Sequence, residues 1–359
     1  MCMRKSKTWL VFISLVSLIV VRFFTGQATY QNGQKVRVSA TVLTEPIRYE
    51  TSQYLKVTGL KIYLPLFPEI SYGDKIVVEG IVENRSLKDA TLKKLQTERN
   101  YLFDFRKKLI TFYQSVLPEP YAGLIAGITL GSKGALSGEL WEKVKLTGVA
   151  HVVVASGMNV TFVTAFLINF LSVFLPRKKS IPFAILGIIL YLLVAGFEAP
   201  LIRAAIMGTV AFLAQETGRL VTAAKALLLS AAIMLLINPL WVGDLGFVLS
   251  FVATASLMLF ERRIREKLKL IPDILKEGLS TSLAAQIGVT PILFVTFGQF
   301  NILSPVINAL VLWTIPLIMI LGSIGGIVGL VVPILGKSIL YLSYPLLWYF
   351  VSIVTLFLP

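Results

Sequence analysis

The sequence predicts a polytopic α-helical membrane bundle with broken helices, joined to a small extracytoplasmic OB-like β-barrel domain. Three observations indicate this fold class. The 359 residues are 56% hydrophobic and only 15% charged, with a mean hydropathy of +0.79, which excludes an ordinary soluble protein. The hydrophobic residues gather at the two ends of the chain, around a polar block from about residue 30 to residue 108. Short segments of that block alternate polar and apolar residues as β-strands do.

The first element is an amino-terminal transmembrane anchor, residues 1–29. A basic head precedes the apolar run 9–26, which is just long enough to cross a hydrocarbon core of about 30 Å as a helix. A cleaved signal peptide also fits the charged head. However, no A-x-A-like site closes the run and later segments re-enter the membrane, so we expect an uncleaved anchor. Cys2 is the only cysteine, so no disulfide is expected within the chain.

The second element is an OB-like β domain, residues 30–98. Segments 35–46, 54–64 and 74–84 each show partial alternation with β-branched residues, bounded by turn residues. Gly80 inside the third segment suggests a bulge or a strong bend. Several short strands in so small a region suit a small β-barrel, for which the OB-fold is a good candidate.

Nucleic-acid binding by this domain is one of two open interpretations. Tyr54, Tyr63, Lys56 and Lys61 could stack on a single strand and hold its phosphates. The domain is nearly neutral, however, with ten Lys or Arg and eight Asp or Glu residues. Fold alone does not establish function, so a structural or docking role is an equal alternative.

The third element is an amphipathic interfacial helix, residues 99–118. Its apolar residues recur at spacings of one, three or four around a basic triplet, which is typical of a helix lying in the membrane interface. A helix packed against the β domain is the alternative. The apolar segment 123–131 that follows is too short to span a membrane and is expected to be re-entrant.

The fourth element is the polytopic membrane domain, residues 119–359. Eight candidate spans lie near 151–175, 181–197, 199–214, 222–237, 240–260, 279–298, 303–332 and 337–357. Several are short or broken by Gly and Pro, so two or three are expected to be half-helices.

The formal charge of +15 indicates topology more than nucleic-acid binding. Much of the excess lies in basic clusters at 4–7, 106–108, 177–179 and 262–269, and most of these flank apolar runs. Lys and Arg collect on the cytoplasmic side of such runs whatever the function. Alternating the spans places the loops at 177–179 and 262–269 on the same face as the amino terminus. We therefore expect a cytoplasmic amino terminus and an extracytoplasmic β domain.

Catalysis is not expected from the segment LTGVAHVVVASGMNV (146–160), although it holds the only histidine. If the segment were helical, Ser156 and His151 would be rotated about 140° apart, which argues against a nucleophile–base pair. A single histidine excludes a multi-histidine zinc centre. The chain has no P-loop, H-E-x-x-H or Cys-x-x-Cys motif. We expect no catalytic residue, no metal and no cofactor.

Polar groups recur through the apolar spans and together suggest a polar seam beside a water-filled cavity. Glu198 and Arg203 carry opposite charges five residues apart and are expected to have different partners. For any single polar residue, helix capping, a kink or bonding between helices is the more common explanation. The predicted structural helix breaks are Pro200, Pro239, Gly246 and Pro291.

These motifs resemble the competence domain of the ComEC family. The resemblance is carried, in order, by GLIAGITLG (123–131), LSGELWEKVKLTGVAHVVVASGMNV (136–160), APLIRA (199–204), Asn238–Pro239 with GDLGFVLSF (243–251), Gln286, Thr290–Pro291 and Asn308. It covers roughly residues 120–316. The anchor and the OB-like block also resemble the amino-terminal region of that family, though less distinctively.

The resemblance implies a multi-pass channel of the bacterial inner membrane that passes single-stranded DNA into the cytoplasm during natural transformation. The candidates for lining the channel or contacting DNA are His151, Ser156, Gly157, Asn159, Arg203, Asp244, Ser250, Gln286 and Asn308. Arg203 could hold a phosphate or pair with an acidic residue, whereas Asp244 more plausibly supports the helix framework.

Two departures from the family pattern matter. Many relatives have a second histidine where this chain has Asn159, and the chain ends at Pro359 without a metallo-β-lactamase-like nuclease domain. The implied partners are single-stranded DNA, membrane lipid, a separate nuclease, a DNA receptor or pilus components and a cytoplasmic ATPase, and a homo-oligomer is also open. The alternative functions are a transporter or assembly factor for another envelope polymer or lipid, and a non-conducting membrane scaffold.

Overall fold

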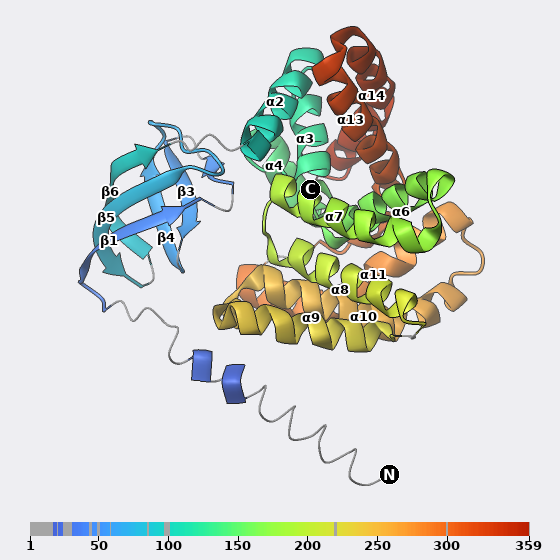
Figure 1. The fold of residues 1–359 in the computed structure, drawn as a ribbon, viewed down its shortest axis with the longest axis horizontal. Coiled ribbons are helices and arrows are strands. Elements are labelled where there is room, and N and C mark those ends of the chain that lie inside the picture. Colours follow the sequence, from blue (N-terminus) through green and yellow to red (C-terminus); the bar gives the residue numbers. More distant parts are fainter. Residues whose placement is uncertain are drawn as a thin grey trace.

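A computed structural model describes residues 17–19, 21–23, 31–42, 45–48, 51–57, 59–84, 86–96, 101–218, 221–298 and 301–358. The predicted amino-terminal anchor lies largely outside these residues. Figure 1 shows a β domain in blue beside a larger helical body. The domain boundaries proposed from the sequence remain a prediction.

The β domain is one mixed six-stranded sheet in the order β1-β5-β6-β4-β3-β2. Its strands are β1 (Lys35–Thr41), β2 (Ile47–Arg48), β3 (Ser52–Val57), β4 (Leu60–Pro65), β5 (Lys75–Glu83) and β6 (Ser86–Gln96). Neighbours pair antiparallel except β4 and β6, which are parallel. The described pairings leave β1 and β2 at opposite edges, so closure into an OB-like barrel remains a prediction.

Alternation of apolar residues builds the core of this sheet. Leu60, Ile62 and Leu64 of β4 are buried while the residues between them are exposed. The predicted bulge at Gly80 is confirmed by a register shift between Glu79 and Ile81. A Cβ at Gly80 would lie only 2.7 Å from Leu87 Cγ, so the close approach of β6 requires glycine here.

Two strand predictions need correction. Segment 54–64 is not one strand but a hairpin of β3 and β4, in which Val57 pairs with Leu60 across a two-residue turn. Gly59 has a φ of +83°, which glycine adopts without steric cost. Strand β6 was not predicted, because most of its residues are polar and only a few apolar ones alternate with them.

The helical body consists of α2 (Tyr101–Val116), α3 (Tyr121–Leu130), α4 (Gly138–Leu146), α5 (Ala150–Val153), α6 (Gly157–Phe174), α7 (Arg177–Ala195), α8 (Ala199–Glu216), α9 (Ala223–Ile237), the 3-10 helix η1 (Pro239–Gly243), α10 (Leu245–Lys267), α11 (Asp273–Phe297), α12 (Ser304–Val311), α13 (Thr314–Val331) and α14 (Pro333–Leu356). In Figure 1 helices α8 to α11 form one layer, and α2, α3, α13 and α14 pack as a second group. Helices α6 and α7 pack together between them.

The protein is a multi-pass membrane protein, because six helices in the described part of the chain are long and apolar enough to span a bilayer. These are Ala150–Phe174, which comprises α5, a short break and α6, and Arg177–Ala195, Leu245–Lys267, Leu275–Thr296, Thr314–Val331 and Pro333–Leu356. Helix α9 is a shorter apolar helix, and α8 is not among the six. The expected span 303–332 is divided into α12 and α13. The eight expected spans therefore include shorter and broken helices, as predicted.

Helix α2 confirms the predicted helix at 99–118, and its buried face packs on α3 and α13 rather than on the β domain alone. Tyr113 is fully buried there and donates a hydrogen bond to Gly322 O over 3.0 Å. Helix α3 is only ten residues long, and nine of them are buried. Placement of α2 in the membrane interface and re-entry of α3 remain predictions.

Candidate functional site

The polar segment before α6 forms a break between two helices. Helix α5 ends at Val153, and the backbone at Val154 and Ser156 is extended. Val154 is β-branched, a residue type that favours extended backbone. The break removes the continuous helix assumed for the His151–Ser156 geometry. His151 is exposed, and the hydroxyl of Ser156 donates instead to Asn159 Oδ1 over 3.3 Å.

Asn159 ties the start of α6 to α3. Its side chain is fully buried, and Nδ2 donates to the backbone oxygen of Ile128 over 2.7 Å. Loss of the Asn159 amide would leave the buried carbonyl of Ile128 without a hydrogen bond, which would destabilise the fold. Asn159 therefore acts as a structural contact here.

Arg203 lies in the second turn of α8 and points toward α10. Its Nη1 donates to Ser250 O over 3.1 Å, and the guanidinium carbon lies 5.9 Å from the centre of the Phe251 ring. The same two residues also carry buried polar atoms, Arg203 Nε and Ser250 Oγ, that have no hydrogen-bond partner among the residues that the structure describes. Buried polar atoms are usually bonded, so two orphans at one place mark a position that can accept a polar ligand or water.

Glu198, the acidic residue five positions before Arg203, has a different partner from Arg203, as predicted. Glu198, at the N-cap position of α8, pairs through Oε1 with Lys133 Nζ over 2.6 Å. Arg203 is thus not neutralised by the carboxylate nearest to it in sequence.

Three helices begin at this position. Asp244 caps α10 by accepting a hydrogen bond from Phe247 N over 3.1 Å. A Cβ on Gly246 would lie 3.0 Å from Asp244 Oδ1 and 4.0 Å from Pro200 Cδ, so the starts of α8 and α10 adjoin. A Cβ on Gly157 would lie 3.0 Å from Arg203 Nη2, which brings in the start of α6.

We call this group the helix-end site; it consists of Ser156, Gly157, Asn159, Arg203, Asp244, Gly246 and Ser250. The amino-terminal end of a helix carries a partial positive charge and free N–H groups. The ends of α6 and α8 beside a guanidinium favour an anion, whereas the end of α10 already carries the Asp244 carboxylate. The arrangement can therefore bind a phosphate or carboxylate group without a metal ligand set.

Asn308 belongs to a second polar group away from the helix-end site. Its Nδ2 donates to Ser282 Oγ and Ser304 Oγ, both over 3.2 Å, and its Oδ1 is buried without a partner. These bonds join α12 to α11. Gln286 lies one turn after Ser282 on α11 and is half-buried.

The predicted helix breaks have mixed outcomes. Pro200 and Pro239 lie in the first turns of α8 and η1, where proline is tolerated, and Gly246 lies in the first turn of α10. The prediction of a break at Pro291 is wrong, because α11 runs continuously from Asp273 to Phe297. Pro291 is exposed on the helix surface, and membrane helices tolerate proline where local adjustments satisfy the freed carbonyl.

A buried arginine that was not among the predicted site residues joins the β domain to the helices. Arg106 of α2 is 4% exposed, and its Nη2 lies 3.1 Å from Glu45 Oε2. Its Nη1 donates to the backbone oxygens of Leu130 over 2.9 Å and Val194 over 2.5 Å, in the last turns of α3 and α7. The guanidinium also lies 5.1 Å from the centre of the Tyr72 ring.

This contact, which we call the domain junction (Glu45, Tyr72, Arg106 and Ser132), is densely bonded. Ser132 Oγ donates to the second carboxylate oxygen of Glu45 over 2.7 Å. Burial raises the pKa of Tyr72, while the positive charge of Arg106 lowers it in part. The spacing of apolar residues in the sequence could have indicated that Arg106 is buried. Arg106 lies three residues before the buried Leu109 and so on the same face of α2, whereas Lys107 and Lys108 lie on the exposed side.

The four β-domain residues singled out from sequence share one region of the sheet. Tyr54 pairs with Tyr63 and Lys56 pairs with Lys61 in the β3–β4 register, and the two tyrosine ring centres lie 5.1 Å apart.

Comparison with known proteins identifies relatives of the helical part. A family model described as Competence protein matches residues 128–358, which include the whole helix-end site. The chain is 29% identical over 227 residues to ComE operon protein 3 of Bacillus subtilis (strain 168), covering 63% of this chain and 29% of that protein. It is also 29% identical over 216 residues to Competence protein ComA of Neisseria gonorrhoeae, covering 56% of this chain and 30% of that protein. The chain therefore aligns with about three tenths of the length of these curated relatives. No solved structure matches it.

Proposed function

This chain belongs to the competence protein family, and from that premise we propose that it is a channel of the bacterial inner membrane that passes single-stranded DNA into the cytoplasm. The matching family model is described as Competence protein and one relative is named Competence protein ComA, and competence is the uptake of DNA. DNA is the proposed substrate, and its phosphate backbone is the part that a channel without sequence preference must recognise.

The observation that carries this proposal is the unsatisfied donor capacity of the helix-end site. Arg203 Nε and Ser250 Oγ are buried and unpaired where three helix amino termini meet. Hydrogen bonds from a guanidinium to phosphate are among the strongest that proteins make. We propose that a backbone phosphate takes up these donors as the strand passes.

The β domain would hold the strand before it enters the helices. In the proposed orientation, the amino terminus is cytoplasmic and the β domain is extracytoplasmic, following the basic loops. The adjacent rings of Tyr54 and Tyr63 would stack on bases, a contact that tolerates any sequence. Closure of the sheet into an OB-like barrel belongs to this proposal.

The chain itself is proposed to be non-enzymatic. Strand separation and energy would come from partners: a separate nuclease, a DNA receptor or pilus components, and a cytoplasmic ATPase. A transporter for another envelope polymer or lipid is the competing function.

The test measures entry of fluorescent DNA into the cytoplasm of cells that carry Arg203→Gln or Ser250→Ala. We expect Arg203→Gln to lower uptake by about 10- to 100-fold, because it removes charge-assisted bonds of about 1.5–3 kcal/mol. Arg177→Gln, at the exposed start of α7, is the matched control and should transport normally.

Membrane abundance is measured for each variant by immunoblotting. Normal uptake by Arg203→Gln at wild-type abundance would overturn the role of the helix-end site. Normal uptake by a strain lacking the protein would overturn the DNA channel and leave the competing transporter.

A further inference from the structure

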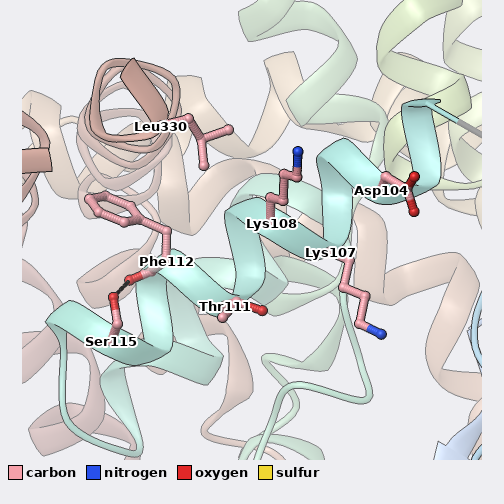
Figure 2. A pocket seen from close by; sticks show the side chains of 7 residues that line it. All are labelled: Asp104, Lys107, Lys108, Thr111, Phe112, Ser115 and Leu330. Atoms are coloured by element: carbon pink, nitrogen blue, oxygen red, sulfur yellow. Dashed lines mark hydrogen bonds between the residues drawn. The ribbon is translucent and has the colours of Figure 1, made fainter. Parts of the chain in front are cut away.

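A groove on the outer surface of α2 lies away from both polar groups described above. Figure 2 shows it between α2 and the end of α13. It consists of two neighbouring hollows of about 490 and 640 Å³. Asp104, Lys108 and Leu330 line both hollows, so they adjoin along one face of α2.

Glycine in α13 sets the floor of this groove. A Cβ at Gly329 would lie 2.1 Å from Phe112 Cε1, so the Phe112 ring rests directly against the α13 backbone. Leu330 then forms the wall beside it. In Figure 2 Lys108 rises from α2 on the same side as Phe112 and Leu330.

The polar lining of the groove is basic. Lys107 and Lys108 are exposed, and neither forms an ion pair in the part of the chain that the structure describes. Asp104 is the single acidic residue of the lining, and Thr111 adds an exposed hydroxyl group. The groove therefore carries a net positive charge and can donate several hydrogen bonds.

Exposed apolar side chains continue from the groove at the turn between α13 and α14. Val331 is 80% exposed, Ile334 78% and Leu335 56%. These residues lie at the ends of two candidate membrane spans, where an exposed apolar surface suits contact with acyl chains. A basic groove that continues into an apolar surface matches a molecule with a charged head and a hydrocarbon tail.

We propose that this groove binds an anionic phospholipid, with its headgroup phosphate at Lys107, Lys108 and Thr111 and its acyl chains along the exposed end of α13. A DNA strand fits less well, because the apolar end of α13 gives phosphates no partner. This site does not depend on the proposed transport of DNA, because it requires only that the protein lies in a bilayer.

Native mass spectrometry of the detergent-purified full chain tests the site. Wild-type protein should retain phosphatidylglycerol about 10- to 30-fold better than phosphatidylcholine, the factor expected from two lysines near a lipid phosphate. K107Q/K108Q should lose this preference. K178Q/K179Q, an exposed adjacent pair at the start of α7, carries the same charge change and should keep it.

Two further variants separate the groove from simple charge. Leu330→Trp fills the groove while both lysines remain, and it should lower phosphatidylglycerol retention. Asp104→Asn removes the acidic residue and should raise retention a few-fold. Each variant must elute as a single species in size-exclusion chromatography.

The proposal is overturned if K107Q/K108Q retains phosphatidylglycerol as well as wild type does. It is also overturned if a single-stranded oligonucleotide binds at these lysines and phosphatidylglycerol does not displace it.

Discussion

Two arginines in the helical body differ in how fully their donors are used. Arg106, at the domain junction, bonds a carboxylate and two helix-end carbonyls and lies over a tyrosine ring. Arg203, at the helix-end site, makes one backbone bond and leaves Nε buried and unpaired. The first arginine completes a structural contact, and the second retains capacity for a ligand.

The difference shows that burial of a charge does not by itself indicate function. A buried charge that has all its partners adds little net stability, but removal of one partner destabilises the fold strongly. A buried donor without an acceptor has lost its hydrogen bonds to water and gained none in return. Unpaired donors of this kind are found mainly where ligands bind. The three predictions below test this distinction, from the largest expected effect to the smallest.

Arg106→Gln should destabilise the protein most. It leaves the Glu45 carboxylate and the Leu130 and Val194 carbonyls without their cation, a change expected to cost about 3–5 kcal/mol. Thermal unfolding of the detergent-purified chain, followed by size-exclusion fluorescence, measures the shift. Arg177→Gln, at the exposed start of α7, is the control and should unfold as wild type does. A wild-type unfolding temperature for Arg106→Gln would contradict the structural role.

Asn159→Leu should have an intermediate effect. The buried carbonyl of Ile128 would lose its partner, at a cost of about 1–3 kcal/mol. The same unfolding assay measures it. The matched control is Thr161→Val, because the Thr161 side chain is exposed and bonds only to Gly157 O of its own helix. If both variants unfold alike, Asn159 does not tie α6 to α3.

Arg203→Met should change stability least, by no more than about 1 kcal/mol in either direction. Methionine keeps most of the side-chain volume and removes an incompletely paired charge, a replacement that is often neutral or stabilising. The unfolding temperature should stay near the wild-type value while DNA uptake falls. A loss of stability as large as that of Arg106→Gln would make Arg203 structural and remove the contrast between the two arginines.

Much of the helical architecture could be predicted, because hydropathy and periodicity are local properties. The helix at 99–118, the short segment at 123–131 and the positions of the apolar helices all follow from runs of apolar residues. The errors concern the effect of single residues on the backbone. Gly59 turns one predicted strand into a hairpin, whereas Pro291 does not break α11.

The candidate site was predictable as a set of residues but not as a set of contacts. Ser156, Gly157, Arg203 and Ser250 were named from polar motifs, and the structure places them together. Asn308 was named for the same reason, yet it bonds within a separate group on α11 and α12. Arg106 was counted among basic flanking residues, although its spacing from Leu109 places it on the buried face of α2.

The sequence by itself determined that this protein is a multi-pass membrane protein with a small β domain, and which of its membrane residues are polar. In a bilayer each helix must satisfy its own backbone, so local hydrophobicity largely decides where helices lie. Only the tertiary structure decided which polar groups are satisfied. Arg106 meets Glu45 across 61 residues and Val194 across 88, and Arg203 meets Ser250 across 47. Such pairings depend on how distant helices pack, which no local pattern encodes.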